Sequence, residues 1–260
     1  MTLWTDTRHG AVAVLTFTNP PRNLMPMAGM TELREHLDRI ATDDSVTVVV
    51  LIGGIDGYFV AHADTADLAK LGHGEPVDGD PADWSRALAL MAEMPQPVVA
   101  AVDGQAWGGG CEISLGATMR VASTAAHFAQ PEVAVGIIPG AGGTQRLSRL
   151  VGTGRAARMV LTGEPIDADD ALRIGLVEAV LPDDGFLDHV LTWVAPMIRH
   201  PRGAVVAAKR AVLEGSEKPL AEGLALETQM FIELQMTEEA VRLEGEVSAA
   251  YQRGEDWSLD

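Results

Sequence analysis

The chain contains little cysteine and little lysine. Of its 260 residues, only Cys111 is a cysteine and only three are lysines. A single cysteine excludes an internal disulfide, so we expect a reducing compartment, the cytoplasm, and we interpret Cys111 as a small buried apolar residue rather than a nucleophile. With 19 basic and 37 acidic residues the net charge is −18. This charge argues against nucleic acid as a partner, because such binding needs a basic surface.

Long apolar runs are also missing. No uninterrupted run reaches the roughly 20 apolar residues that span a bilayer. The N-terminus, MTLWTDTRHG, lacks the charged and then apolar pattern of a signal peptide. We therefore expect no membrane partner. The histidines show no metal-ligand spacing, so we expect no metal site.

Two kinds of apolar pattern alternate along the first 200 residues. Continuous or alternating apolar runs predict strands at 11–18, 46–52, 98–102 and 177–181. Helical spacing predicts helices at 27–42, 83–94, 143–151, 155–161 and 167–174, the last with Asp167 as its N-cap. After Pro201 only helical patterns follow, at 203–214, 219–236 and 237–253. We predict an α/β domain over 1–200 and a helical region over 201–260.

Residues 97–146 concentrate the groups that can do chemistry. A buried strand ends at Asp103-Gly104, and the triplet 108–110 (GGG) opens the next predicted helix. Glycine lets the backbone approach a ligand closely, and the first turn of a helix leaves its N–H groups unpaired. Those donors suit a carbonyl oxygen that becomes negative during a reaction. For an isolated glycine triplet, the alternative is a tight, closely packed turn.

Two carboxylates accompany the glycines. Glu112 follows the triplet, and Glu132 lies twenty positions later. A pair of glutamates can activate water and protonate carbon, provided that burial raises a pKa enough for proton transfer near neutrality. The stretch therefore predicts acid/base chemistry through an enolate. A further glycine cluster, 140–143, lacks the GxxxxGK[ST] pattern of a phosphate-binding loop, and we expect Gln145 and Arg146 beside it to brace a helix start.

Three runs of sequence resemble the crotonase superfamily, which contains enoyl-CoA hydratases and isomerases. They are AVDGQAWGGGCEISL (101–115), FAQPEVAVGIIPGAGGTQRL (128–147) and, more loosely, YFVAHADTADL (58–68). The resemblance covers nearly the whole chain. It implies a spiral of ββα units over 1–200 and a helical oligomerisation region over 201–260. It also implies an acyl-CoA thioester substrate, a homotrimer or dimer of trimers, and no cofactor, because CoA is carried on the substrate.

The resemblance also assigns roles at the site. The backbone N–H groups of Ala63 and Gly109 would bind the thioester oxygen. Glu112 would activate the water that attacks the β-carbon and Glu132 would deliver the α-proton, or the pair would share these tasks. The residues expected to contact the substrate or its CoA are Arg22, Ala61, His62, Asp64, Leu68, Gly108, Pro131 and Gly140.

Two features depart from the family pattern. His62 stands where the family usually has glycine, and it would stack on or hydrogen-bond the ligand, narrow the pocket, or point away. Near the C-terminus, the acidic, aromatic and basic residues of the family occur with stretched spacing in 238–253. The apolar group formed by Met230, Phe231, Leu234 and Met236 is either part of a subunit interface or intramolecular core.

The leading hypothesis is an enoyl-CoA hydratase, which adds water reversibly across the double bond of a 2-enoyl-CoA to give a 3-hydroxyacyl-CoA. Having both Glu112 and Glu132 favours hydration, because isomerases of the family commonly retain one of the pair. The alternatives are an enoyl-CoA isomerase or another crotonase-type reaction, and a non-catalytic protein that binds acyl-CoA. Acyl chain length and pathway do not follow from the sequence.

Overall fold

The computed structural model describes residues 2–256, which fall into two compact units. The first unit runs through Ile198 and the second begins at Arg199. The division lies two residues before the boundary expected after residue 200. The first unit contains all the strands, and the second is helical.

A six-stranded sheet forms the centre of the first unit. Its order is β1 (Trp4–His9), β2 (Val12–Phe17), β3 (Val48–Gly53), β5 (Val98–Val102), β7 (Met119–Ser123) and β10 (Ala179–Leu181). Only β1 and β2 pair antiparallel. Along β3, Val48 and Val50 face one hydrophobic cluster, whereas Val49 and Leu51 face the other. Burial of both faces explains why β3 is a continuous apolar run in the sequence.

The chain enters a second sheet directly after β3, after β5 and after β7. Its order is β4 (Tyr58–Val60), β6 (Gln105–Trp107), β8 (His127–Ala129) and β9 (Ile166–Asp167). The first three are parallel, and β9 is antiparallel to β8. The chain passes from β3 to β4, from β5 to β6 and from β7 to β8, and a helix follows each pair. This repeat is the predicted spiral of ββα units, so that prediction is confirmed.

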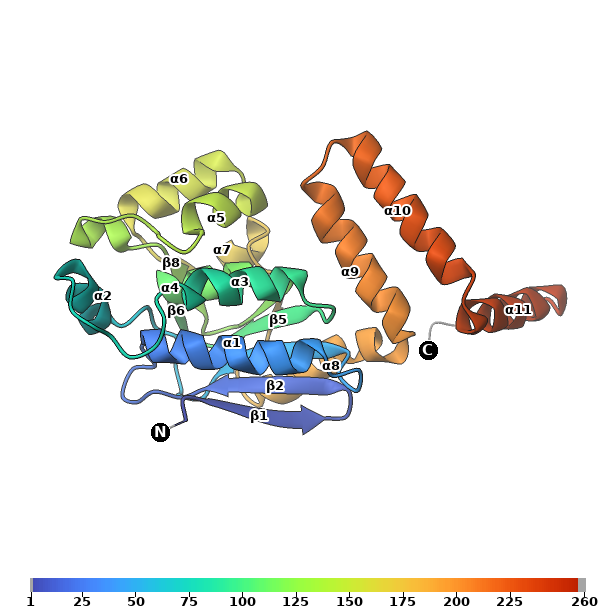
Figure 1. Ribbon diagram of the computed structural model, residues 1–260, viewed down its shortest axis with the longest axis horizontal. Coiled ribbons are helices and arrows are strands. Elements are labelled where there is room, and N and C mark those ends of the chain that lie inside the picture. Colours follow the sequence, from blue (N-terminus) through green and yellow to red (C-terminus); the bar gives the residue numbers. More distant parts are fainter. Residues whose placement is uncertain (1, 257–260) are drawn as a thin grey trace. The chain divides into compact units, whose positions relative to one another are not determined.

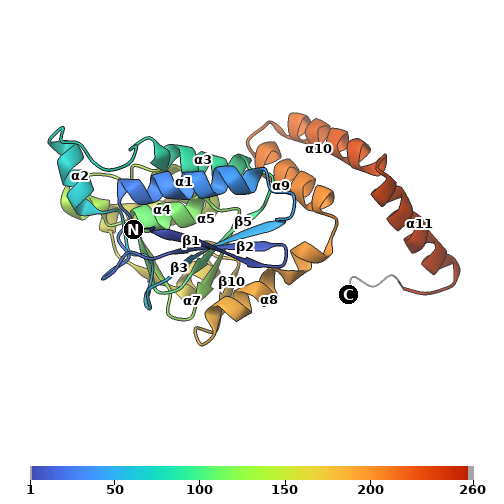
Figure 2. The same ribbon diagram turned by 60° about the horizontal axis from the view of Figure 1, so that its bottom comes forward.

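Helices cover both faces of the six-stranded sheet (Figures 1 and 2). On one face lie α1 (Met27–Ala41), α3 (Asp83–Glu93) and α4 (Gly109–Gly116). On the other, α8 (Phe186–Arg199) packs through Phe186, Val190 and Val194. The remaining helices of the unit are α2 (Thr65–Gly72), η1 (Glu132–Val135), α5 (Gly143–Val151), α6 (Thr153–Thr162) and α7 (Ala168–Arg173). Asp167 caps α7 by accepting from the Asp170 N–H at 2.8 Å, which confirms the predicted N-cap.

The second unit consists of three helices, α9 (Arg202–Ser216), α10 (Leu220–Gln235) and α11 (Glu238–Gln252). α9 and α10 form an antiparallel hairpin (Figure 1). Of the apolar group noted in the sequence, Met230 is buried, but Phe231 and Met236 are 58% and 80% exposed. The group is therefore divided between an inward and an outward face. Within residues 2–256 every helix is too short or too polar to cross a lipid bilayer.

Candidate active site

The candidate site lies at one edge of the second sheet. β4, β6 and β8 are parallel, so the loops that follow them leave at the same edge. Ala63 follows β4, the glycine triplet follows β6, and Glu132 follows β8. The Gly108 N–H donates to the Ala129 carbonyl at 2.9 Å, which extends the pairing of β6 and β8 into the site. The topology thus assembles the site from three segments that are far apart in the sequence.

The backbone amides of Ala63 and Gly109 lie next to each other. Gly109 is the first residue of α4, so its N–H is one that a helix leaves unpaired. A Cβ added at Gly109 would lie 3.2 Å from the Ala63 nitrogen and 2.7 Å from Cη2 of Trp84. Only glycine permits this close approach. The two N–H groups, at the positive end of α4, can bind one carbonyl oxygen between them.

The loop after β4 directs the Ala63 N–H away from its neighbouring strand. Met25 N–H donates to the His62 carbonyl at 2.9 Å, and Asp64 N–H donates to the Met25 carbonyl at 2.7 Å. In a parallel pair, the residue between the two bonded ones points its own N–H to the opposite side. Ala63 is that residue, bridged to Met25. Within residues 2–256 its N–H finds no acceptor, so it is available to a ligand.

Asn23 anchors this loop. It is completely buried, and its φ of 54° is one that asparagine tolerates better than most residues. Its side-chain nitrogen donates to the carbonyls of Phe17 at 3.0 Å and Phe59 at 2.7 Å. Its own carbonyl accepts from the Ala61 N–H at 3.0 Å. These bonds tie the loop that carries Ala63 to the ends of β2 and β4.

Glu112 is held through a single carboxylate oxygen. Its Oε1 accepts from the N–H groups of Ala141 at 2.7 Å and Gly143 at 2.8 Å. Burial raises the pKa of Glu112, and the two N–H bonds oppose that rise. Oε2 faces no donor within the described residues, so it is the oxygen that can take a proton from water. Arg146 donates to the Ala141 carbonyl at 2.8 Å, which is the bracing role that we expected.

Glu132 lies over the glycine triplet. Its Oε1 would be 2.8 Å from a Cβ added at Gly108, which places the carboxyl group beside the first turn of α4. Burial, together with the negative charge of Glu112, raises the pKa of Glu132 to about 7. Both protonation states are therefore populated at neutral pH, so this group can deliver or remove a proton.

Two further residues belong to the site but were not singled out from the sequence. Gln130 is fully buried, and with its amide nitrogen turned toward Glu132 it donates to both carboxylate oxygens at 3.2 Å. The Trp84 indole packs against Gly109, and its Nε1–H donates to the Met27 sulfur at 3.1 Å. The available signals were weak: Gln130 stands two residues before Glu132, and Trp84 is the one aromatic residue in the predicted helix 83–94.

Several expected binding residues shape the loops of the site. The buried Ala61 accepts from the Trp107 N–H at 3.0 Å. Asp64 caps α2 by accepting from the Ala66 N–H at 2.8 Å. Pro131 immediately precedes η1, the short helix that begins at Glu132.

The other expected residues are less closely tied to the reacting groups. Arg22 is exposed, and within residues 2–256 no hydrogen bond or ion pair joins it to them. Leu68 is 37% exposed on α2, and Gly140 is exposed in the loop before α5. The substrate contacts expected for these three residues stay predictions. Cys111 is fully buried and burial raises the pKa of its thiol to about 12, which confirms that it is a core residue.

A paired backbone oxyanion site beside two carboxylates suits reactions that pass through the enolate of a thioester. A family model described as enoyl-CoA hydratase/isomerase matches residues 7–257. The chain therefore belongs to the enoyl-CoA hydratase/isomerase family.

Relatives and solved structures agree with this assignment over almost the full length. The 2,3-dehydroadipyl-CoA hydratase of Escherichia coli K12 is 40% identical, over 95% of this chain and 94% of that protein. The short-chain-enoyl-CoA hydratase of Clostridium acetobutylicum is 35% identical, over 89% of each chain. The crystal structure of an enoyl-CoA hydratase from Bacillus anthracis superposes with a TM-score of 0.87 at 30% identity and covers 98% of both chains.

Proposed function

We propose that this chain is an enoyl-CoA hydratase that adds water reversibly to a 2-enoyl-CoA. One observation carries the proposal: two carboxyl groups in different protonation environments converge on a pair of backbone N–H donors. Glu112 is held by two amides through Oε1, whereas Glu132 has its pKa raised to about 7. One is suited to remain a base and the other to carry a proton.

In this proposal the thioester carbonyl oxygen binds between the N–H groups of Ala63 and Gly109. Oε2 of Glu112 takes a proton from water as the water oxygen forms a bond to C3, and the electrons of the double bond move onto the carbonyl oxygen. The two N–H groups stabilise that negative oxygen. The enolate then collapses, and C2 takes a proton from Glu132. The product is a 3-hydroxyacyl-CoA, and the reverse sequence eliminates water.

The presence of two usable carboxyl groups favours hydration over migration of a double bond. Isomerisation moves one proton from one carbon to another, and a single acid/base group can carry it. Hydration needs one group at the water and one at C2. Within residues 2–256 neither Glu112 nor Glu132 forms an ion pair, which supports an acid/base role for both.

The substrate class follows from the family and from relatives. Hydratases of enoyl-CoA esters are similar to this chain over most of its length, so we propose an acyl-CoA thioester as substrate and no cofactor. The relative in E. coli is named for a 2-enoyl-CoA whose acyl chain ends in a free carboxylate. A terminal carboxylate on the acyl chain is therefore one substituent to test alongside plain chains of different length.

The test is the loss of enoyl-thioester absorbance when purified protein meets crotonyl-CoA, longer 2-enoyl-CoAs and the 2-enoyl diacid ester. We expect rapid loss with at least one of them. Glu112→Gln and Glu132→Gln should each lower kcat by about 10²–10⁴, the usual contribution of a positioned acid or base. Unchanged rates in both variants would refute the acid/base assignment. Wild-type protein that binds these esters without hydrating any of them would refute the proposed function.

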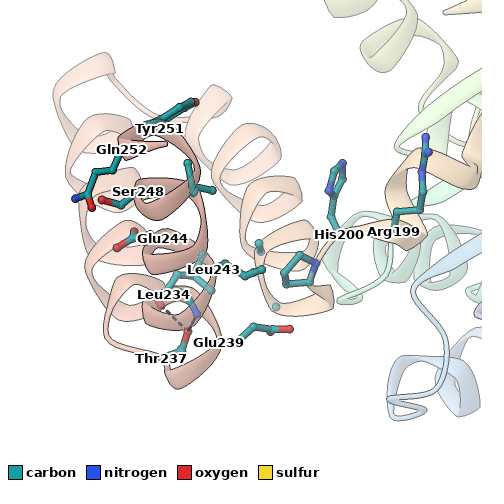
Figure 3. A pocket seen from close by; sticks show the side chains of 15 residues that line it. Arg199, His200, Leu234, Thr237, Glu239, Leu243, Glu244, Ser248, Tyr251 and Gln252 are labelled. Atoms are coloured by element: carbon teal, nitrogen blue, oxygen red, sulfur yellow. Dashed lines mark hydrogen bonds between the residues drawn. The ribbon is translucent and has the colours of Figure 1, made fainter. Parts of the chain in front are cut away.

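We also propose that the second unit joins copies of the chain into a trimer or a dimer of trimers. This unit contains a groove of about 1040 Å³ with a mostly apolar lining that includes Leu234, Leu243 and Tyr251 (Figure 3). Phe231 and Met236 add apolar surface that the chain itself leaves exposed. Apolar surface of this kind is typical of a contact between subunits.

A further inference from the structure

His62 occupies the loop that carries one of the two oxyanion donors. It precedes Ala63, and its side chain is half-buried. Its Nδ1 lies 2.9 Å from the carbonyl oxygen of Ala63. A carbonyl oxygen can only accept a hydrogen bond, so Nδ1 must carry the proton. In the neutral ring this leaves the lone pair on Nε2 and fixes one of the two tautomers.

This bond is one of three hydrogen bonds that hold the two peptide groups on either side of the Ala63 Cα. These two groups contain four polar atoms. The His62 carbonyl accepts from Met25, the Asp64 N–H donates to Met25, and the Ala63 carbonyl accepts from the His62 ring. The fourth is the Ala63 N–H, the donor proposed for the thioester oxygen. The three bonds fix both peptide planes and leave one direction for that N–H.

We propose that His62 is a positioning residue: its Nδ1–H holds the Ala63 carbonyl, and together with the two bonds to Met25 it limits rotation about the Ala63 Cα and so steadies the direction of the Ala63 N–H in the oxyanion site. This inference rests on the proposed hydration. Preorganised donors stabilise an oxyanion better than donors that must reorient during the reaction. Glycine at this position would have no side chain that could make this bond.

The position of His62 relative to Glu132 supports a role in the site. A Cβ added at Gly108 would lie 3.8 Å from the His62 Cβ and 2.8 Å from Oε1 of Glu132. The His62 Cβ and the Glu132 carboxyl group therefore lie on the same side of the glycine triplet. The His62 side chain therefore begins near the Glu132 carboxyl group, not on a distant part of the loop.

The first test uses the wild-type protein. A long-range ¹H–¹⁵N correlation spectrum of histidine-labelled protein, at a pH where the ring is neutral, distinguishes Nδ1–H from Nε2–H rings, and His62→Gln identifies the His62 signal. We expect the Nδ1–H tautomer for His62. The Nε2–H tautomer would overturn the proposal, because Nδ1 could then only repel the Ala63 carbonyl oxygen. The tautomer itself is measured on the wild-type protein, and the variant serves only to assign the signal.

The second test separates the Nδ1 position from the rest of the ring. Asparagine at position 62 places an N–H near the Nδ1 position, whereas glutamine places it near Nε2. Loss of a whole oxyanion donor costs about 10²–10³ in kcat, and we expect His62→Ala and His62→Gln to lower kcat by about tenfold because the donor is only loosened. His62→Asn should stay within about threefold of wild type. An aryl-substituted 2-enoyl-CoA, whose absorbance moves to longer wavelength when its carbonyl is polarised, should shift less when bound to the first two variants.

His73→Ala is the matched control. His73 also contacts a backbone carbonyl through Nδ1, that of Ala69 at 2.7 Å, but it does so at the exposed end of α2. Its removal should leave kcat and the absorbance shift unchanged. Equal behaviour of His62→Ala and wild type in both measurements would overturn the proposal, as would rescue by glutamine but not asparagine. A wild-type protein that fails to hydrate would instead refute the proposed function, and the absorbance shift of the bound ester would still test His62.

Discussion

Glu112 and Glu132 are chemically identical side chains in different surroundings. The two amides of Ala141 and Gly143 hold the Glu112 carboxylate and oppose the rise in its pKa that burial causes. Burial raises the pKa of Glu132 to about 7, and the charge of Glu112 adds to that rise. In the proposed mechanism, this difference in surroundings, rather than in residue type, makes Glu112 the base and Glu132 the acid.

The raised pKa of Glu132 has a consequence for stability. An unfolded glutamate loses its proton near 4.5, but folded Glu132 keeps it until about 7. In that interval the folded state binds the extra proton, so the free energy of unfolding falls as pH rises, and the loss is complete above about 7. Glutamine cannot lose a proton. We therefore predict that Glu132→Gln raises Tm relative to wild type by more at about pH 8 than at about pH 5.

Thermal unfolding at both pH values measures this difference. Glu93→Gln, at an exposed carboxyl on α3, is the control and should change Tm equally at both. If Glu132→Gln also changed Tm equally at both pH values, Glu132 would not keep its proton to near neutrality in the folded protein.

At the level of single residues, sequence motifs predicted some residues of the site, whereas others are recognised only from their contacts in the structure. Glu112, Glu132 and the glycine triplet stand in runs whose pattern indicates their chemistry. Gln130 and Trp84 do not, because a buried glutamine and an aromatic residue on a helix have many structural uses. What makes them part of the site is contact across the fold, Gln130 with Glu132 and Trp84 with Gly109, and spacing along the chain does not encode such contacts.

Among the elements, the packing of α3 against α4 determines the geometry of the proposed oxyanion site. Trp84 contacts the position of a Cβ at Gly109, and Leu88 and Met91 contact that of Gly116. α3 therefore lies along α4, with its first turn beside the first turn of α4. Glycine at both positions lets the two helices approach closely.

We predict that Gly109→Ala forces these elements apart. The new Cβ would meet Trp84 at 2.7 Å and the Ala63 side chain at 3.1 Å, closer than van der Waals contact allows. Overpacking of this kind costs about 1–3 kcal/mol, and displacement of one donor should lower kcat by about 10² or more. Gly154→Ala in α6 is the control, since nothing lies within 4 Å of its added Cβ. It should keep kcat and raise the free energy of unfolding by about 0.5–1 kcal/mol.

Urea unfolding and initial-rate kinetics check both variants. A Gly109→Ala protein with wild-type kcat would show that the close approach of Gly109 and Ala63 is not needed for activity. A Gly154→Ala protein as damaged as Gly109→Ala would show that the loss reflects helix glycines in general.

Long elements were predictable and short ones were not. The helices at Met27–Ala41 and Asp83–Glu93 follow from apolar periodicity because each buries one face. The strand Val48–Gly53 follows from a continuous apolar run because it is buried on both faces. The strands of the second sheet have two or three residues, too few for a period to show. β1, WTDTRH, was missed because it is an edge strand of largely polar residues with only its first residue buried.

For the whole molecule, the exposed apolar side chains of the second unit bear on how copies of the chain assemble. The second unit leaves Leu220, Phe231 and Met236 exposed by 79%, 58% and 80%. We predict that light scattering gives a mass of three or six copies of the 27.5 kDa chain. Phe231→Asp should lower that mass, because a charge at an apolar contact loses solvation without gaining a partner.

The control is Glu227→Gln, on the same helix at an exposed polar position, and it should leave the mass unchanged. A wild-type protein that stays monomeric at the concentrations used for kinetics would contradict the proposed role of the second unit. The expectation of a trimer comes from the resemblance, because no pattern in the sequence specifies the number of subunits.

The spiral of the first unit also affects how the protein acquires its activity. Ala63, Gly109 and Glu132 follow β4, β6 and β8, which belong to successive turns of the spiral. Parallel pairing of distant segments is a slow step in folding. A folding intermediate that has formed only the first of these turns has the Ala63 amide in place but not the carboxyl group of Glu132. With the proposed roles of these residues, catalysis begins only after the third of these strands has paired, and the return of activity during refolding marks the completion of the spiral.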